Sequence, residues 1–444
     1  MHNKLKRFIR GAVPSLMVLA GVVIDMDRAE AIPAFARQTA QACTACHTQH
    51  FPTLNSFGRL FKAQGYTMGG TQETVQGEGL DLPGTLNAAL VGSLGVQRVS
   101  DGNGSSMKKV GFPSSLSLYF GGRIGKNSGF LMEMPFEGAE VENATPVDPN
   151  EPIEVKGEGG PSLAQLGSLK WNYVKDYSGT NLGLNAYSSA MAGPAYGYEL
   201  LSTGAMGMNV AVTGANAMGA IGLHMEHGAT LMSAFMDKMS GMSMRMAGGA
   251  TGLGASVQGS EWFVYYSAYF GAQAMDYVSD PSFAHYVRAV WMPSFAGWDL
   301  GIGTQIYAGS FAYGGGNEYD AKANTFDFQA QGDIAGMATG LYVTYATAPK
   351  SDGGKTNWYN TSMGGANSSY AFLYEMEVIS RLSLNLGYTS ATYWAMSNEL
   401  KGTLTQLGGN YLLAPNKRLG FKYANFGGAD LDSNTLALDL TIGF

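Results

Sequence analysis

The last nine residues of the chain read Leu436-Ala437-Leu438-Asp439-Leu440-Thr441-Ile442-Gly443-Phe444. Apolar side chains occupy every second position, and small or polar side chains occupy the positions between them. Successive side chains of a β-strand point to opposite faces of a sheet. The stretch therefore predicts a strand with one apolar face that ends in an aromatic residue and one face of small and polar groups.

The same alternation recurs through most of the chain. From about residue 86 onward, alternating segments of about ten residues follow one another, separated by clusters of Gly, Asn, Asp, Ser and Pro. In residues 382–389, for example, Leu384 and Leu386 share one face, and Ser383 and Asn385 share the other. We count roughly 16 to 18 such segments, which predicts an all-β fold, an antiparallel barrel of about 16 strands.

Composition favours a barrel in a membrane over a pair of soluble β-sandwiches, which is the alternative. Only 14% of the residues are charged, against about 25% in ordinary soluble domains. A lipid-facing barrel keeps apolar groups outside and small polar groups inside, and the terminal strand looks like the recognition strand of outer-membrane barrel proteins. We expect Tyr307, Tyr393 and Trp394, near segment ends, to lie in interfacial girdles. The net charge of -7 argues against nucleic acid as a partner.

The first 31 residues predict an export signal. Lys4, Lys6, Arg7 and Arg10 precede the apolar stretch 11–24, and Ala29-Glu30-Ala31 has the small-x-small pattern of a cleavage site. We expect residues 1–31 to be a cleaved signal peptide. An uncleaved anchor is the alternative, but the apolar stretch is shorter than the roughly 20 residues of a helical span.

A haem-attachment motif, Cys43-Thr44-Ala45-Cys46-His47, follows the export signal. Two thiols at this spacing can form thioether bonds to the two vinyl groups of one haem, and His47 is placed to bind the iron. A structural zinc site would need four ligands, and Cys43 and Cys46 are the only cysteines. We therefore predict one covalently bound haem c, held by Cys43, Cys46 and the proximal ligand His47.

The second axial ligand is less determined. A thioether would raise the haem potential, and Met68 lies in a Gly-flanked turn further along the chain, so Met68 is a candidate distal ligand. His50 is too close in sequence to His47 to reach round the haem easily. An open site or a residue of the barrel lumen is the other alternative.

These features divide the chain into a signal peptide (1–31), a haem segment (32–68), a Gly-rich linker (69–84) and a barrel (85–444). The haem segment is too small to bury a core of its own, so we expect it to be mainly helical and to plug or cap the barrel.

Three other clusters favour structural interpretations. We expect the acidic residues over 137–158 to form a solvated loop rather than to concentrate Fe(II), and the Met residues over 232–246 to be apolar filler rather than a Cu(I) site. His224 and His227 would face opposite sides of a strand, which disfavours a metal site there.

The haem segment also resembles a known family. The stretches 31–39, 50–59 and 65–68, together with 121–127 and 196–205 further on, closely resemble the fused cytochrome–porin family of iron-oxidising bacteria. The resemblance is dense over the haem segment and patchy across the rest. It implies a monohaem cytochrome fused to a porin in the outer membrane, acting as an Fe(II) oxidase.

On this reading, the chain is an oxidoreductase that takes electrons from extracellular Fe(II) at a single haem and passes them to a periplasmic c-type cytochrome or similar carrier. Outer-membrane lipid surrounds it. Two alternatives stay open. In the first, the chain is a solute porin whose haem segment serves as a structural plug. In the second, it is an outward-directed metal reductase, a class of protein that usually needs several haems.

Overall fold

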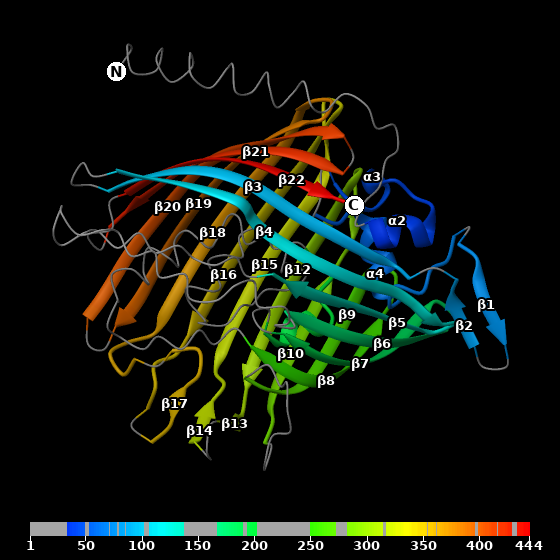
Figure 1. The fold of residues 1–444 in the computed structure, drawn as a ribbon. Helices are drawn as coiled ribbons and strands as arrows, with labels where there is room; N and C mark the ends of the chain where they lie inside the picture. Colours follow the sequence, from blue (N-terminus) through cyan, green and yellow to red (C-terminus); the bar gives the residue numbers. More distant parts are fainter. Residues whose placement is uncertain are drawn as a thin grey trace, which may run out of the picture.

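The computed structural model describes residues 33–48, 53–70, 72–77, 80–84, 86–101, 106–136, 167–189, 193–201, 249–271, 282–313, 317–352, 354–360, 362–395, 398–414, 416–428 and 433–444. Sixteen long strands of this part of the chain close into one antiparallel barrel (Figure 1), as predicted. In chain order these are β3 (Ala88–Asp101), β4 (Ser106–Gly125), β5 (Ser128–Pro135), β6 (Ser168–Tyr177), β7 (Thr180–Ser189), β8 (Ala250–Gln258), β9 (Trp262–Phe270), β10 (Ala284–Trp291), β12 (Trp298–Ala308), β15 (Ala323–Ile334), β16 (Met337–Ala348), β18 (Asn367–Ile379), β19 (Leu382–Ala395), β20 (Asn398–Ala414), β21 (Lys417–Gly427) and β22 (Ser433–Gly443).

Short elements complete the described fold. β11 (Ser294–Phe295) continues β10 at the turn into β12. β13 (Ser310–Tyr313), β14 (Asn317–Asp320) and β17 (Thr356–Asn357) form a small sheet outside the barrel, and η1 (Pro194–Gly197) is a single 3₁₀ turn. The expected linker 69–84 contains a hairpin of β1 (Thr74–Gly77) and β2 (Leu80–Pro83), which the sequence reading did not anticipate.

The first and last barrel strands pair with each other and so close the barrel. β22, the alternating C-terminal stretch, pairs antiparallel with β3, the first barrel strand, with Leu440 opposite Leu94. The backbone of Phe444 continues the ladder by exchanging two hydrogen bonds with Leu90, at 2.7 and 2.9 Å. The predicted terminal strand is confirmed, and its partner is the strand most distant from it in the chain.

The barrel is apolar outside and polar inside. On β6, Leu169 and Trp171 are 37% and 41% exposed, whereas Lys170 and Asn172 between them are 2% and 5% exposed. β19 repeats the pattern, with Leu384 and Leu386 exposed and Ser383, Asn385 and Thr389 buried, as the sequence predicted. This distribution is the reverse of a soluble protein and is the one a barrel in lipid requires.

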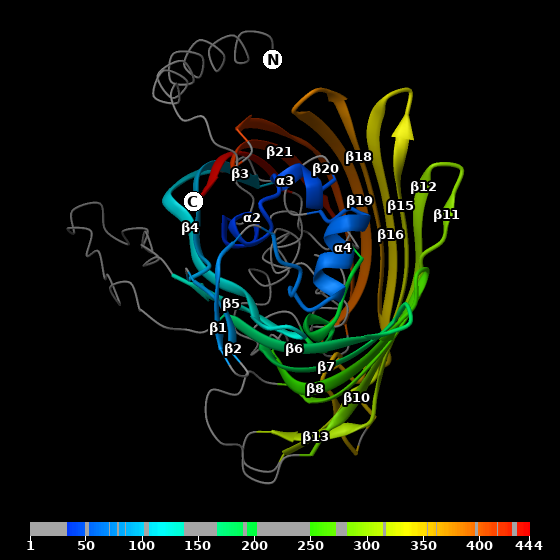
Figure 2. The ribbon, with the colours of Figure 1, turned by 90° about the vertical axis from the view of Figure 1, so that its right-hand side faces the viewer.

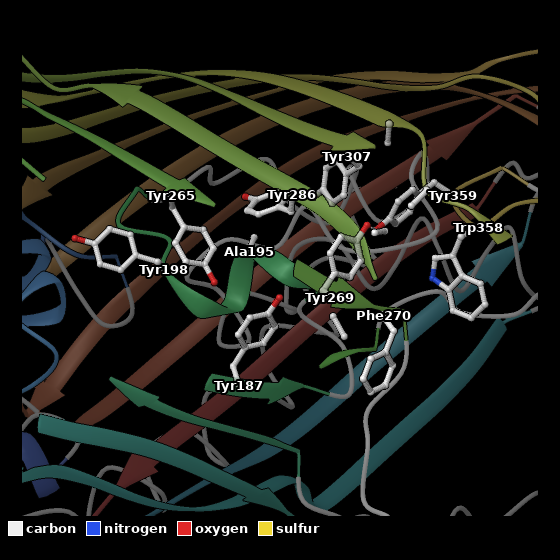
Figure 3. Packing of buried hydrophobic residues seen from close by; sticks show 14 of the residues in the cluster. Tyr187, Ala195, Tyr198, Tyr265, Tyr269, Phe270, Tyr286, Tyr307, Trp358 and Tyr359 are labelled. Carbon is white, nitrogen blue, oxygen red and sulfur yellow. The ribbon is translucent and has the colours of Figure 1, made fainter. Parts of the chain in front are cut away.

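One prediction about the aromatics is wrong. Tyr307 is only 3% exposed and packs inside the barrel, 5.0 Å between ring centroids from Tyr286 and 4.9 Å from Tyr359 (Figure 3). Its place near the end of β12 suggested an interfacial girdle, but the lumen beside β7–β12 is filled with packed aromatic rings. Near the end of a strand, an inward aromatic is therefore as compatible with the fold as an outward one.

The two ends of the barrel differ. At one end, β4–β5, β6–β7, β8–β9, β15–β16, β18–β19 and β20–β21 are joined by short turns, such as Ser178-Gly179 and Ala335-Gly336, which take positive φ. At the other end the connections include the long stretches 136–167, 190–249 and 349–366. We call these the short-turn end and the long-loop end.

The N-terminal segment lies inside the ring of strands (Figure 2). It contains α2 (Pro33–Thr39), α3 (Cys43–Cys46) and α4 (Ser56–Ala63), and we call the described residues 33–48 and 53–70 the plug. Among the described residues, the helices are too short or too polar to span a bilayer. The expectation of a short helical segment that plugs or caps the barrel matches this arrangement.

The outward face of β19 gives a direct test of whether the outer surface of the barrel contacts lipid. Replacing Leu386, which is 47% exposed, by Arg should destabilise the barrel by about 2–4 kcal/mol, because a charge would enter the hydrocarbon region. Leu386→Ile is the control and should leave stability nearly unchanged. Urea unfolding in liposomes measures both; equal stability of the Arg variant and wild type would show that this face does not meet lipid.

Candidate functional site

The haem motif forms one helical turn. Cys43 and Cys46 are the first and last residues of α3, so their i,i+3 spacing places both side chains on one side of the turn. Cys43 is 5% exposed, and Cys46 is half-buried. His47 leaves the helix with extended backbone, and its N–H donates to the carbonyl of Cys43 at 3.1 Å. The three candidate haem-binding side chains are therefore brought together.

Asn55 connects this turn to α4. Its Nδ2 donates to the carbonyl of Ala45 at 3.0 Å, and its backbone N–H donates to the carbonyl of Cys46 at 3.0 Å. Its Oδ1 meanwhile accepts from the N–H of Gly58 at 2.9 Å, which caps the first turn of α4. One side chain thus starts the helix and fixes the motif against it. The asparagine before an apolar helical stretch is the sequence signal for the cap, but the contact with Ala45 has no such signal.

Gly58 allows the two helical pieces to touch. A Cβ added at Gly58 would lie 2.1 Å from the carbonyl oxygen of Cys46. Only a residue without a side chain fits between α4 and the motif turn, so this glycine serves close approach rather than chain flexibility.

The plug is attached to the barrel wall on the side of β12 and β15. Nη1 of Arg59 donates to Oε1 of Gln331 at 2.7 Å, and Nε2 of Gln331 donates back to the carbonyl of Leu54 at 3.1 Å. Arg59 also lies 3.6 Å from the carboxylate of Asp299. Asp299 and Gln331 lie close to the turns at the short-turn end, so the motif side of the plug is held near that end.

A second attachment is made by Gln38 of α2. Its Oε1 accepts from the backbone N–H of Arg123 at 3.1 Å and from Nδ2 of Asn87 at 3.3 Å, both on the barrel. Its Nε2 donates to the carbonyls of Tyr66 and Met68, at 2.6 and 2.8 Å. The candidate distal ligand Met68 is therefore fixed beside α2, the helix that precedes the motif.

The residues of the motif fit a c-type haem. Among the described residues, no group of three or more His, Cys, Asp and Glu side chains gathers in one place. Burial raises the pKa of the Cys46 thiol, whereas a reactive redox dithiol has a lowered one. Two thiols on one helical turn followed by an imidazole form the donor set for covalent haem attachment.

Several sequence predictions lie outside the described residues. These are the signal peptide (residues 1–31), the alternative ligand His50, the acidic stretch 137–158, the pair His224 and His227, and the Met-rich stretch 232–246.

No protein-family model matches the chain. No curated protein matches it either. Solved structures with a similar fold include outer-membrane expressed OmpT of Vibrio cholerae, at 10% identity over 84% of this chain and 100% of that chain, with a TM-score of 0.42. A BenF-like porin from Pseudomonas fluorescens Pf-5 matches at 10% identity over 81% of this chain and 99% of that chain, with a TM-score of 0.44. OccAB3 of Acinetobacter baumannii matches at 8% identity over 80% and 98% of the two chains, with a TM-score of 0.43. Likeness at this level concerns barrel architecture alone.

The close approach at Gly58 predicts that an alanine there changes stability in the direction opposite to the usual one for a helix. Gly→Ala inside a helix ordinarily stabilises it by about 1 kcal/mol. Gly58→Ala should instead destabilise the plug, because the new methyl group would collide with the Cys46 carbonyl. Ser56→Ala, on the exposed side of α4, is the matched control. The urea midpoint of the plug and its haem content should fall for Gly58→Ala only; a raised midpoint would contradict the packing.

Lys62 of α4 gives a pH prediction. Burial lowers its pKa from the usual 10.5 to about 8, although nearby Glu199 opposes the shift. Between about pH 8 and pH 10.5, the unfolded plug keeps a proton on Lys62 that the folded plug has lost, so stability should rise with pH across this window. Below pH 8 the full cost of the buried charge is present. Urea unfolding followed by near-ultraviolet circular dichroism should show this rise in wild type, and Lys62→Met should abolish it.

Proposed function

We propose that this chain is an outer-membrane electron-transfer protein that oxidises extracellular Fe(II) through a single c-type haem bound to Cys43 and Cys46, with His47 as the proximal ligand. The observation that carries the proposal is the position of the motif. A helical turn with the haem-attachment donor set is braced by Asn55 and docked through Arg59 on the inner wall of a membrane-type barrel. A barrel with the porin fold thereby holds a redox segment within its lumen.

The chain's own residues hold and orient the group. When bound, the haem supplies a one-electron couple whose potential depends on its axial ligands and surroundings. Asn55 and Gly58 fix the turn that bears His47, and Gln38 fixes the backbone of Met68, the candidate distal ligand. Arg59 and Gln331 keep this assembly against the wall. Rigid attachment limits reorganisation, which favours rapid electron transfer.

The asymmetry of the barrel supports a direction. Outer-membrane barrels carry short turns on the periplasmic side and longer loops outside. The plug is docked near the short-turn end, within reach of a soluble c-type cytochrome or similar periplasmic carrier. Fe(II) would enter from the long-loop end along an inner wall that bears polar and acidic side chains, among them Glu375 and Asp439. Export by residues 1–31 completes this proposal.

The test is anaerobic addition of Fe(II) to the oxidised protein in outer-membrane vesicles, with the haem absorption bands followed in time. We expect the reduced c-type spectrum to appear rapidly and to be absent from a Cys43→Ala/Cys46→Ala variant. A covalently bound haem that stays ferric in excess Fe(II) would rule out the oxidase.

A solute porin with a structural plug is the second candidate. One observation favours it: Gln38, Arg59 and Leu54, none of which belongs to the motif, attach the plug to the barrel. These attachments need no haem to form. A ferric haem inert to Fe(II), together with substantial solute flux through the barrel, would make this candidate the better one.

A further inference from the structure

A second piece of chain enters the barrel beside the plug. Residues 193–201, which we call the inward segment, follow β7 and include the turn η1. Leu200 and Leu201 are each 1% exposed. The wall leaves room for them, since a Cβ added at Gly301 of β12 would lie 2.8 Å from Leu201 Cδ1. The inward segment is therefore seated in the lumen and does not lie over the barrel mouth.

A buried charge cluster anchors the inward segment. Glu199 is fully buried, and its Oε1 accepts from the backbone N–H groups of Leu200 and Leu201 at 3.0 and 2.9 Å. Its Oε2 lies 2.6 Å from Nε of Arg288 on β10, and Arg288 also binds Asp327 on β15 at 2.5 Å. Two carboxylates on one buried guanidinium satisfy its donors, so the segment is tied to two strands of the wall.

Lys170 connects the inward segment to the plug. This residue of β6 is 2% exposed, and its Nζ donates to the carbonyl of Tyr196 at 3.2 Å. The same nitrogen lies 4.5 Å from the centre of the Tyr196 ring and 5.5 Å from the centre of the Tyr66 ring. Tyr196 belongs to the inward segment and Tyr66 to the plug. One buried amine thus contacts both, and it lies over each ring in the geometry of a cation–π interaction.

The two pieces also share apolar packing. Ala63, in the last turn of α4, belongs to the same buried cluster as Ala195 and Leu200 of the inward segment. Within the plug, Phe35 stacks on Tyr66 with 5.0 Å between ring centroids, and Phe61 meets the Tyr66 ring edge-on at 5.7 Å. Tyr66 is therefore packed against rings of both α2 and α4.

We propose that the plug and the inward segment form a single latch, pinned by Lys170, that closes the lumen between β6 and β12. Loss of the pin releases the plug from the inward segment and opens a conducting path through the barrel. This role concerns lumen closure and does not depend on the haem or on Fe(II) oxidation.

The test is single-channel conductance of the full-length protein in planar lipid bilayers. Lys170→Met keeps the approximate length of the side chain and removes its amine, and we expect a several-fold increase in conductance over wild type. Lys175→Met is the matched control. Lys175 is on the same strand, but it is exposed and its Nζ lies 4.8 Å over Tyr177; its variant should conduct as wild type does.

Tyr66→Leu provides a second route, because Tyr66 lies in the plug and its replacement leaves every barrel strand intact. It should open the lumen as Lys170→Met does, and the double variant should conduct no more than either single variant, since all three remove the contact between Lys170 and Tyr66. Heat-modifiable gel mobility verifies that each barrel is folded. Wild-type conductance in folded Lys170→Met and Tyr66→Leu proteins, or additive increases in the double variant, would overturn the latch.

Discussion

The structure depends on one constraint: a backbone that crosses a bilayer must satisfy its own hydrogen bonds. An open sheet would leave two strands with unpaired N–H and C=O groups in lipid. Here the pairing of β22 with β3 removes both edges, and the register from Ser433 to Gly443 runs without interruption along β3. The alternation of outward apolar and inward polar residues follows from the same constraint, because the lipid contacts one face only.

A closed barrel of this size has a polar interior, and this sets the chemistry of everything inside it. The plug has too small a core to be stable alone, so its contacts with the barrel wall must stabilise it. It docks by hydrogen bonds, through Arg59 to Gln331 and through Gln38 to the backbone of Arg123. A fully buried guanidinium, Arg288, is tolerated in the lumen because Glu199 and Asp327 both bind it. Polar walls thus make it possible for the plug to be held within the barrel.

The sequence predicts the features that repeat locally. Period-two alternation identifies the strands, their approximate number and their inner and outer faces, as the burial of Asn385 beside the exposed Leu386 shows. The haem motif is likewise a local pattern. Contacts between distant positions carry no such signal: Arg59 and Gln331 are 272 residues apart, and nothing near either one indicates the other. Tyr307 was misassigned for the same reason, because proximity to a strand end does not tell which rings fill the lumen.

The central claim is that a covalently bound haem lies in the lumen near the short-turn end. Enhanced relaxation of a nitroxide by the ferric haem measures this directly, with one label at Asp333, near the end of β15 before the β15–β16 turn, and another at Glu318 of β14, beyond the long-loop end. Both side chains are exposed, so each label is attached through a cysteine introduced there, while the native thiols are blocked in the haem-bound protein. The account predicts clearly stronger relaxation at position 333 than at position 318. Equal effects, or a stronger effect at position 318, would contradict it.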